Sequence, residues 1–275
     1  MRIVVCFVFA ALVLTAQAPT DRDRKLERAM GERLLESIEA ATPRIPDAEV
    51  ERYISGIVAK VAAACAPDLA IETRVMVSPS FTAHAIPGGF LLFNTGLIQR
   101  ADNEAELAGV AAQLVSYLQA GSYIRRRTNA SGVPLVYTGG WSGYTYGVTH
   151  ENNGPIGFRK QLAQDTAKAD TAAVQCLSKS GYDPEQFLTN LRKLEAIESE
   201  GKLTTPVGEL LPASKRAADV AVALRGLAAS PDSVLDRAAF AEIRTRAQSA
   251  TQTATASRKT TPPSLRNRVP KSQIM

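Results

Sequence analysis

The segment from residue 82 to residue 119 constrains the fold of this 275-residue chain most, because it specifies a β-hairpin followed directly by a long helix. Pro87-Gly88-Gly89 has the residue types of a tight turn. The apolar run from Phe90 to Asn94 then predicts the second strand of the hairpin. The chain must therefore pack a small sheet beside a helix, and with 45% hydrophobic residues it can bury a sizeable core.

The helix after the hairpin has a clear start and a clear buried face. Asn103, with Glu106 three positions later, resembles a capping box and predicts a helix from about Glu104 to Ala120. Its apolar residues recur at helical spacing, so one face should belong to the core. These residues are Leu107, Val110, Ala111, Leu114 and Leu118.

Four ordered sequence elements resemble the Ste-type zinc metallopeptidases, the family of CAAX prenyl proteases, HtpX and periplasmic outer-membrane-assembly peptidases. They are AxPGG at 85–89, NTGLI at 94–98, DNEAELAGV at 102–110, and an Asp170 correctly spaced before Gly-Tyr-Asp-Pro at 181–184. The resemblance covers roughly residues 25–200. It implies a zincin-like (gluzincin-like) fold of the α+β class, mostly helical, with a small sheet and a β-hairpin.

In that family the helix carries HExxH, where two histidines hold Zn²⁺ and the glutamate is the general base. The corresponding window here reads Gln113-Leu114-Val115-Ser116-Tyr117. A neutral amide is a poor zinc ligand, and a phenol with an ordinary pKa of about 10 must first lose its proton. Leu114, at the position of the base, accepts no proton at all.

The third family ligand is the glutamate of an ExxxD pattern on a later helix. The resemblance places Asp170 at the aspartate of that pattern and Thr166 at the glutamate. We therefore expect no catalytic residue, no bound metal and no cofactor. A hydrogen bond between Tyr117 and Thr166 is predicted in place of the shared metal.

An alternative interpretation keeps the chain an active zinc endopeptidase with an atypical ligand set. The only histidines are His84 and His150, and Asp165 stands next to Thr166. Neither histidine has a metal-spaced partner in sequence, and a lone histidine is more often an ordinary polar residue than a ligand. Zinc content distinguishes the two interpretations.

Loss of the metal does not remove every function of such a domain. In the family the hairpin strand lies beside the substrate peptide, and an unpaired strand edge binds extended chains through backbone hydrogen bonds. The sequence analysis therefore predicts peptide binding along one strand of the hairpin. Its residues are Gly89, Phe90, Leu91, Leu92, Phe93 and Asn94.

The two ends of the chain differ in composition from the body. Arg2, the apolar run 3–14 and the small-residue box at 16–18 predict a signal peptide over 1–18, cleaved after Ala16 or Ala18 or retained. Residues 19–250 form the metallopeptidase-like domain. Residues 251–275 carry much of the net charge of +5 and predict a disordered basic tail. The body is near neutral, which argues against nucleic acid, and no transmembrane span is expected in the mature chain.

Cys65 and Cys176 remain after removal of the signal. Two free buried thiols are favoured over a disulfide, because sequence cannot establish the short Cα separation that a bridge needs. Further helices are predicted over 22–41, 46–64, 158–180, 184–199, 214–229 and 231–247, and a strand over 71–77. The glycine-rich segment between two of these helices has aromatics that would line a cleft, namely Tyr137, Trp141, Tyr144 and Tyr146.

The combined expectation is a periplasmic or secreted pseudo-peptidase, with a peptide-binding, regulatory or scaffold role in the cell envelope. Its partners would be an extended peptide or an envelope protein. A third interpretation makes the domain a purely structural part of an envelope assembly, contacted through its basic tail.

Overall fold

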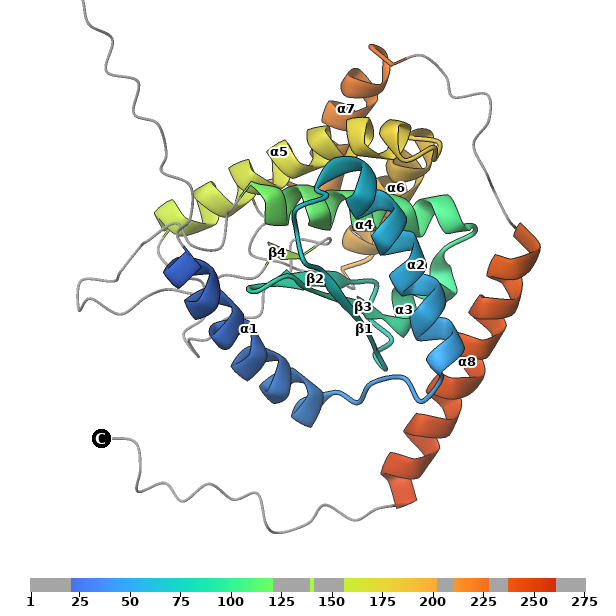
Figure 1. Ribbon diagram of the computed structural model, residues 1–275. Helices are drawn as coiled ribbons and strands as arrows, with labels where there is room; N and C mark the ends of the chain where they lie inside the picture. Colours follow the sequence, from blue (N-terminus) through green and yellow to red (C-terminus); the bar gives the residue numbers. More distant parts are fainter. Residues whose placement is uncertain (1–20, 121–138, 141–155, 202–209, 228–236, 261–275) are drawn as a thin grey trace, which may run out of the picture.

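The computed structural model describes residues 21–120, 139–140, 156–201, 210–227 and 237–260, and this part is mostly helical with one small sheet (Figure 1). The predicted mostly helical α+β class is confirmed at this level. The elements are α1 (Asp21–Ala41), α2 (Ala48–Cys65), β1 (Glu72–Met76), β2 (Ala83–Ile86), β3 (Phe90–Asn94), α3 (Thr95–Arg100), α4 (Glu104–Gln119), β4 (Gly139–Gly140), α5 (Ile156–Lys179), α6 (Glu185–Ser199), α7 (Ala213–Leu224) and α8 (Arg237–Thr260).

The sheet is mixed, with the strand order β1-β3-β2-β4. The hairpin pairs β2 with β3 in antiparallel fashion, and β1 joins β3 in parallel on its other side. Gly88 and Gly89 form the turn with φ values of 80° and 86°, a region that favours glycine. A Cβ on Gly89 would also lie 2.1 Å from the carbonyl oxygen of Ala70, so this turn has no space for a side chain.

The position of β3 corrects the predicted peptide-binding edge. All five residues of β3 are buried, and the strand has a hydrogen-bonded neighbour on each side. Strand addition needs unpaired backbone groups, which β3 does not offer. The unpaired edge on which the prediction for Gly89 to Asn94 depends is therefore not found on β3, because β1 from outside the hairpin occupies the side that local sequence leaves open.

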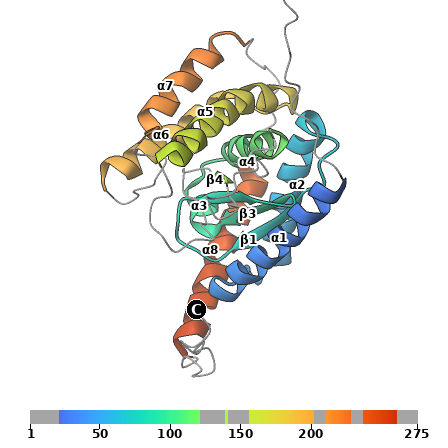
Figure 2. The same ribbon diagram turned by 90° about the vertical axis from the view of Figure 1, so that its left-hand side faces the viewer.

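The sheet lies between α1 on one face and α4 on the other (Figures 1 and 2). Leu35 and Ile38 of α1 pack against Ile86, Phe90 and Leu92 on the first face. Ala83, Ala85, Leu91 and Phe93 of the opposite face belong to the larger core with α4. Helix α4 is thus enclosed between the sheet and α5, α2 and α6.

The helix starts and ends follow the predicted local signals. Asp47 caps α2, and its carboxylate accepts the N–H groups of Glu49 and Val50. Asn103 caps α4 by accepting the N–H of Glu106 at 3.0 Å, although Glu106 reaches back to the N–H of Asp102 rather than to that of Asn103. Helix α5 ends in a Schellman motif at Gly181, which has a φ of 75°.

The C-terminal helices differ from the predicted ranges. Helix α7 ends at Leu224, five residues earlier than predicted. Helix α8 continues through Thr260 and so enters the segment predicted to be a disordered tail. Gln99 of α3 donates to the Thr251 hydroxyl at 3.1 Å, which attaches this part of α8 to the body.

A disulfide joins Cys65 at the end of α2 to Cys176 in α5, with a Cα–Cα distance of 5.6 Å. The preference for two free thiols was wrong, because the packing of α2 on α5 brings two residues 111 positions apart into bonding geometry. Within the described residues, none of the helices combines the length and apolar character needed to cross a membrane. The predicted signal peptide, the aromatic glycine-rich loop with His150, and residues 261–275 lie outside the described part.

Candidate functional site

Helix α4 lies at the centre of the molecule and carries the positions that the resemblance marks as catalytic. Every residue from Ala105 to Leu118 is buried. Gly109 permits close contact with α6, because a Cβ there would lie 3.1 Å from the Phe187 side chain. The helix is therefore a core element on all sides, which its apolar stripe alone did not predict.

The four positions aligned with the family's ligands and base lie in the interior. Gln113, Leu114 and Tyr117 are 1%, 0% and 2% exposed, and Thr166 on the neighbouring α5 is 2% exposed. The Thr166 hydroxyl donates to the carbonyl oxygen of Leu162 at 2.9 Å, one turn back in its own helix. The predicted hydrogen bond between Tyr117 and Thr166 is not found among the described residues. The hydroxyl satisfies itself locally, as threonines in helices commonly do.

The residues at these positions do not fit a zinc ion. Gln113 has a buried Oε1 with no hydrogen-bond partner, but a single neutral carbonyl is a weak ligand, and Leu114 offers no donor atom. Within the described ranges, no three His, Cys, Asp or Glu residues are grouped so that they could hold a metal ion.

The atypical ligand set is divided between two faces of the sheet. His84 pairs across the hairpin with Leu92, and both occupy the face that packs against α1. Asp165 is buried on α5, which packs on α4 beyond the opposite face. His84 thus lies on the α1 face of the sheet and Asp165 on a helix of the opposite side, and His150 lies outside the described residues.

Asp170, the aspartate of the family's ExxxD pattern, forms a buried ion pair with Arg216 of α7. The Arg216 Nε donates to Oδ2 at 2.7 Å and an Nη donates to Oδ1 at 2.8 Å, with both side chains nearly inaccessible. This bidentate geometry is the strongest form of such a pair. Sequence reasoning singled out Asp170 but not its partner. Arg216 does share a buried helical stripe with Ala213, Ala217 and Val220, and that spacing could have identified it.

A second network holds the start of α4. The carboxylate of Glu106 is 1% exposed and accepts the Lys193 ammonium at 2.7 and 2.9 Å, while Asn190 donates to the Glu106 carbonyl at 2.6 Å. Burial raises the pKa of Glu106 above its ordinary value, and the ion pair with Lys193 offsets only part of that rise. No sequence signal pointed to Lys193 or Asn190, since both reach α4 from α6.

Two tyrosines converge on Glu104 at the same end of α4. Tyr182 donates to one carboxylate oxygen at 2.5 Å, and Tyr53 of α2 donates to the other. The Lys60 ammonium lies 4.0 Å from the centre of the Tyr182 ring. Burial, followed by the hydrogen bond to Glu104, raises the pKa of the Tyr182 phenol strongly. The Tyr182 phenol stays a protonated donor, so this cluster ties α2, α4 and the connection between α5 and α6 together.

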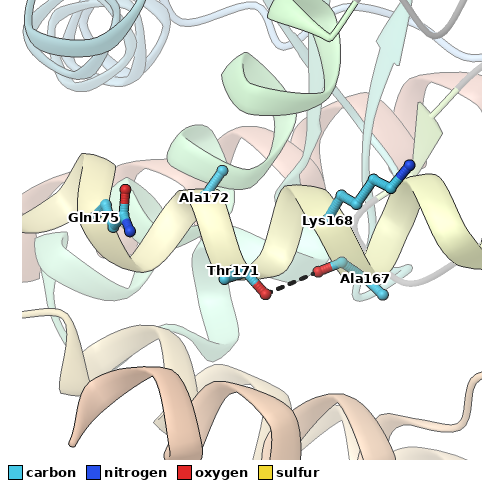
Figure 3. A pocket seen from close by; sticks show the side chains of 5 residues that line it. All are labelled: Ala167, Lys168, Thr171, Ala172 and Gln175. Carbon is cyan, nitrogen blue, oxygen red and sulfur yellow. Dashed lines mark hydrogen bonds between the residues drawn. The ribbon is translucent and has the colours of Figure 1, made fainter. Parts of the chain in front are cut away.

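The surface hollow on α5 is separate from these positions. It has a volume of about 490 Å³ and is lined by Ala167, Lys168, Thr171, Ala172 and Gln175 (Figure 3). The Thr171 hydroxyl donates to the Ala167 carbonyl within the helix. The hollow contains none of the residues predicted for the site, and its lining of small and flexible side chains has no convergent polar groups.

Comparison with known proteins supports a distant relation to bacterial proteases. No family model matches the chain. The beta-barrel assembly-enhancing protease of Escherichia coli (strain K12) is 25% identical over 184 residues, which are 61% of this chain and 37% of that protein. The beta-barrel assembly-enhancing protease of Yersinia pestis is 26% identical over 184 residues, with the same shares. The matched region thus spans well under half of each relative, and the peptidase resemblance predicted from the motifs is supported at this distant level.

Proposed function

We propose that this chain is an exported, catalytically inactive protein with a metallopeptidase-like (zincin-like) domain, which retains a protein-binding or regulatory role in the cell envelope. One observation carries the proposal. The positions of the three ligands and the general base hold Gln113, Tyr117, Thr166 and Leu114, which are all buried, three on α4 and one on the neighbouring α5. None of these side chains is an anionic or imidazole ligand, and removing even one member of a catalytic unit costs orders of magnitude in rate.

The disulfide and the similarity to proteases support the proposed location. A bond between Cys65 and Cys176 is stable in an oxidising compartment and is rare in the cytosol. The proteins that match are named for β-barrel assembly. An envelope location, periplasmic or secreted, accommodates both facts together with the leader predicted from the sequence.

Zinc content and proteolysis test the proposal directly. The chain, purified without chelators, is expected to contain far less than one zinc per molecule and to leave an unfolded protein substrate uncut, with or without EDTA. A working zinc metallopeptidase prepared in parallel is the control for metal loss during purification. Stoichiometric zinc, or cleavage that EDTA abolishes, would overturn the proposal.

A matched variant shows whether the chain lacks only the ligand side chains or also the helix spacing that a zinc site needs. The quadruple variant Gln113→His, Leu114→Glu, Tyr117→His and Thr166→Glu restores the family's residue types at the aligned positions. If α4 and α5 keep the inherited spacing, this variant gains zinc while the parent does not. The rival enzyme hypothesis predicts instead that the parent binds zinc and loses it on His84→Ala.

A further inference from the structure

The outward face of α5 carries positive charge and no exposed acid. Six exposed residues recur at helical spacing on this face, and they are Gln164, Lys168, Thr171, Ala172, Gln175 and Lys179. Lys160, one turn before Gln164, is exposed as well. The acids of the helix, Asp165 and Asp170, are only 7% and 2% exposed. The outward face therefore presents three ammonium groups and no carboxylate.

The three lysines of this face have no counterion within the part of the chain that the structure describes. Lys193 on α6, by comparison, pairs with Glu106 at 2.7 Å. No ion pair between described residues includes Lys160, Lys168 or Lys179. A cation without a local counterion is available to a carboxylate that another molecule supplies.

The hollow on α5 lies within this face, where the side chains are small. It has a volume of about 490 Å³, and Figure 3 shows Thr171 and Ala172 between Gln175 at one end and Lys168 at the other. The Thr171 hydroxyl donates to the Ala167 carbonyl of its own helix. The hollow therefore offers space rather than polar contacts. A protruding apolar side chain of a partner fits such a space, as ridges fit into grooves where helices pack.

The spacing of the charges favours a helical partner. At a rise of about 1.5 Å per residue, Lys168 and Lys179 lie about 16 Å apart along α5. A second helix laid along α5 can place carboxylates at that separation on one face, with an apolar side chain between them. Nucleic acid fits less well, because duplex DNA carries one charge per about 1.7 Å, whereas this face carries three over about 28 Å.

We infer that the outward face of α5 is a docking surface for an acidic helical segment of another protein. Two carboxylates of the partner pair with Lys168 and Lys179, and an apolar side chain between them enters the hollow. This inference rests on the protein-binding role proposed above and supplies its surface and the chemistry of the partner. Exposed ion pairs contribute little each and are screened by salt, so the association is weak and weakens further as the salt concentration rises.

Charge reversal on α5 tests the electrostatic part. The probe is a fluorescent, alanine-rich helical peptide of about 20 residues, with glutamates toward both ends of one face and a leucine midway between them. Lys168→Glu with Lys179→Glu should weaken its binding about tenfold or more, measured by fluorescence anisotropy. The matched control is Lys25→Glu with Arg33→Glu on α1, which changes the net charge equally on the other side of the sheet. Equal weakening in both variants would overturn the inference.

A variant that fills the hollow tests the packing part without a change of charge. Ala172→Leu should weaken binding of the same peptide about fivefold or more, because the partner side chain loses its space. Ala196→Leu, at an exposed alanine of α6, should bind the peptide as the parent does. Binding that Ala172→Leu leaves unchanged would show general attraction of anions and would contradict the docked helix.

Lysine labelling of the unaltered chain covers the case in which a variant does not fold. Saturating peptide should protect Lys168 and Lys179 from acetylation, read by mass spectrometry, while Lys25 stays reactive. Protection by phosphatidylglycerol vesicles but not by the peptide would assign the face to a membrane surface and overturn the inference. The zinc measurement is independent of this result. A chain that holds zinc overturns the proposed function, whereas a metal-free chain without protection on α5 overturns only this inference.

Discussion

At the scale of single residues, the interior contains a buried pair of opposite charges. Asp170 meets Arg216 in a nearly inaccessible, bidentate pair, while the Oε1 of Gln113 on α4 is buried without a hydrogen-bond partner. A buried ion pair contributes little net stability, but loss of one partner leaves a buried charge without compensation. The pair therefore acts mainly to define how α7 sits on α5.

Substitution of Arg216 tests this role. Arg216→Met should lower the free energy of unfolding by about 3–5 kcal/mol, because the Asp170 carboxylate stays buried and unpaired. The double variant Asp170→Leu with Arg216→Met should regain most of that loss. Urea denaturation measures both. The control is the neighbouring Lys215→Met, whose exposed pair with Asp219 should contribute no more than about 1 kcal/mol.

At the scale of elements, backbone proximity decides where α1 can lie. Gly31 sits at the middle of α1, and a Cβ there would lie 1.9 Å from the carbonyl oxygen of Pro87. Arg28, one turn earlier, donates to the Gly88 carbonyl and to Glu72, and its guanidinium lies 4.0 Å from the centre of the Phe90 ring. The helix is thus seated directly on the hairpin turn.

Two glycine-to-alanine substitutions distinguish the effect of close packing on stability from the effect of helix propensity. Gly31→Ala should destabilise the protein by about 1–3 kcal/mol, because the added methyl group forces α1 away from the turn. Gly56→Ala in α2 should instead stabilise by about 0.5–1 kcal/mol, since nothing lies within 4 Å of the added Cβ. Thermal unfolding of the two variants should move the midpoint in opposite directions. Equal shifts would show that α1 does not dock on the turn.

The cap of α2 gives a stability change that depends on pH. Desolvation, the largest influence, raises the pKa of Asp47, but hydrogen bonds from Arg246, Val50 and Glu49 outweigh it, so the pKa lies below its ordinary value of 3.8. A carboxyl whose pKa is lowered on folding stabilises above its unfolded pKa and loses that contribution as pH falls through the folded one.

Asp47→Asn keeps the capping acceptor and removes the charge. The variant should be less stable than the parent at neutral pH. The difference should shrink as the pH falls below about 3.8 and disappear once the pH is below the lowered pKa of folded Asp47. Asp47→Ala should cost about 1 kcal/mol more at neutral pH, because the cap is lost as well. Urea denaturation between neutral and acidic pH measures the series. A difference that grows on acidification would contradict this assignment.

At the scale of the whole molecule, long-range connections hold the helical layers around α4. The disulfide joins Cys65 to Cys176, which are 111 residues apart in the sequence. Gln119 at the end of α4 donates to the Cys65 carbonyl at 3.0 Å. Helix α8 packs against the N-terminal half of the chain, where Arg246 donates to the Asp47 carboxylate. Its apolar residues Phe240, Ile243 and Ala247 are buried. Helix α8 is thereby linked to the start of α2.

Removal of the disulfide tests how much this long-range crosslink contributes to the free energy of unfolding. Cys65→Ser with Cys176→Ser should lower the free energy of unfolding by about 2–4 kcal/mol, since a crosslink limits the freedom of the unfolded chain. Reduction of the parent should give the same value, and reductant should not affect the double variant. Urea denaturation with and without reductant measures each. Equal stability of oxidised and reduced parent would show that the bond does not form.

Local sequence determined most elements and their ends, because caps, turns and helical spacing act over a few residues. Asn103, Gly181 and the Pro87-Gly88-Gly89 turn all have their predicted structural roles. The sequence also determined the residue types at the aligned positions, since Gln113, Leu114, Tyr117 and Thr166 offer neither an imidazole nor a carboxylate in any conformation.

Only the tertiary structure decided which groups meet. The parallel pairing of β1 with β3 made β3 an interior strand and left the outer side of β2 to β4. The alternation of β2 placed His84 on the face of α1, and helix packing brought Cys65 to Cys176 and Arg216 to Asp170. These pairings join residues far apart in the chain, and the free energy that selects them comes from burial of the shared core rather than from any local pattern.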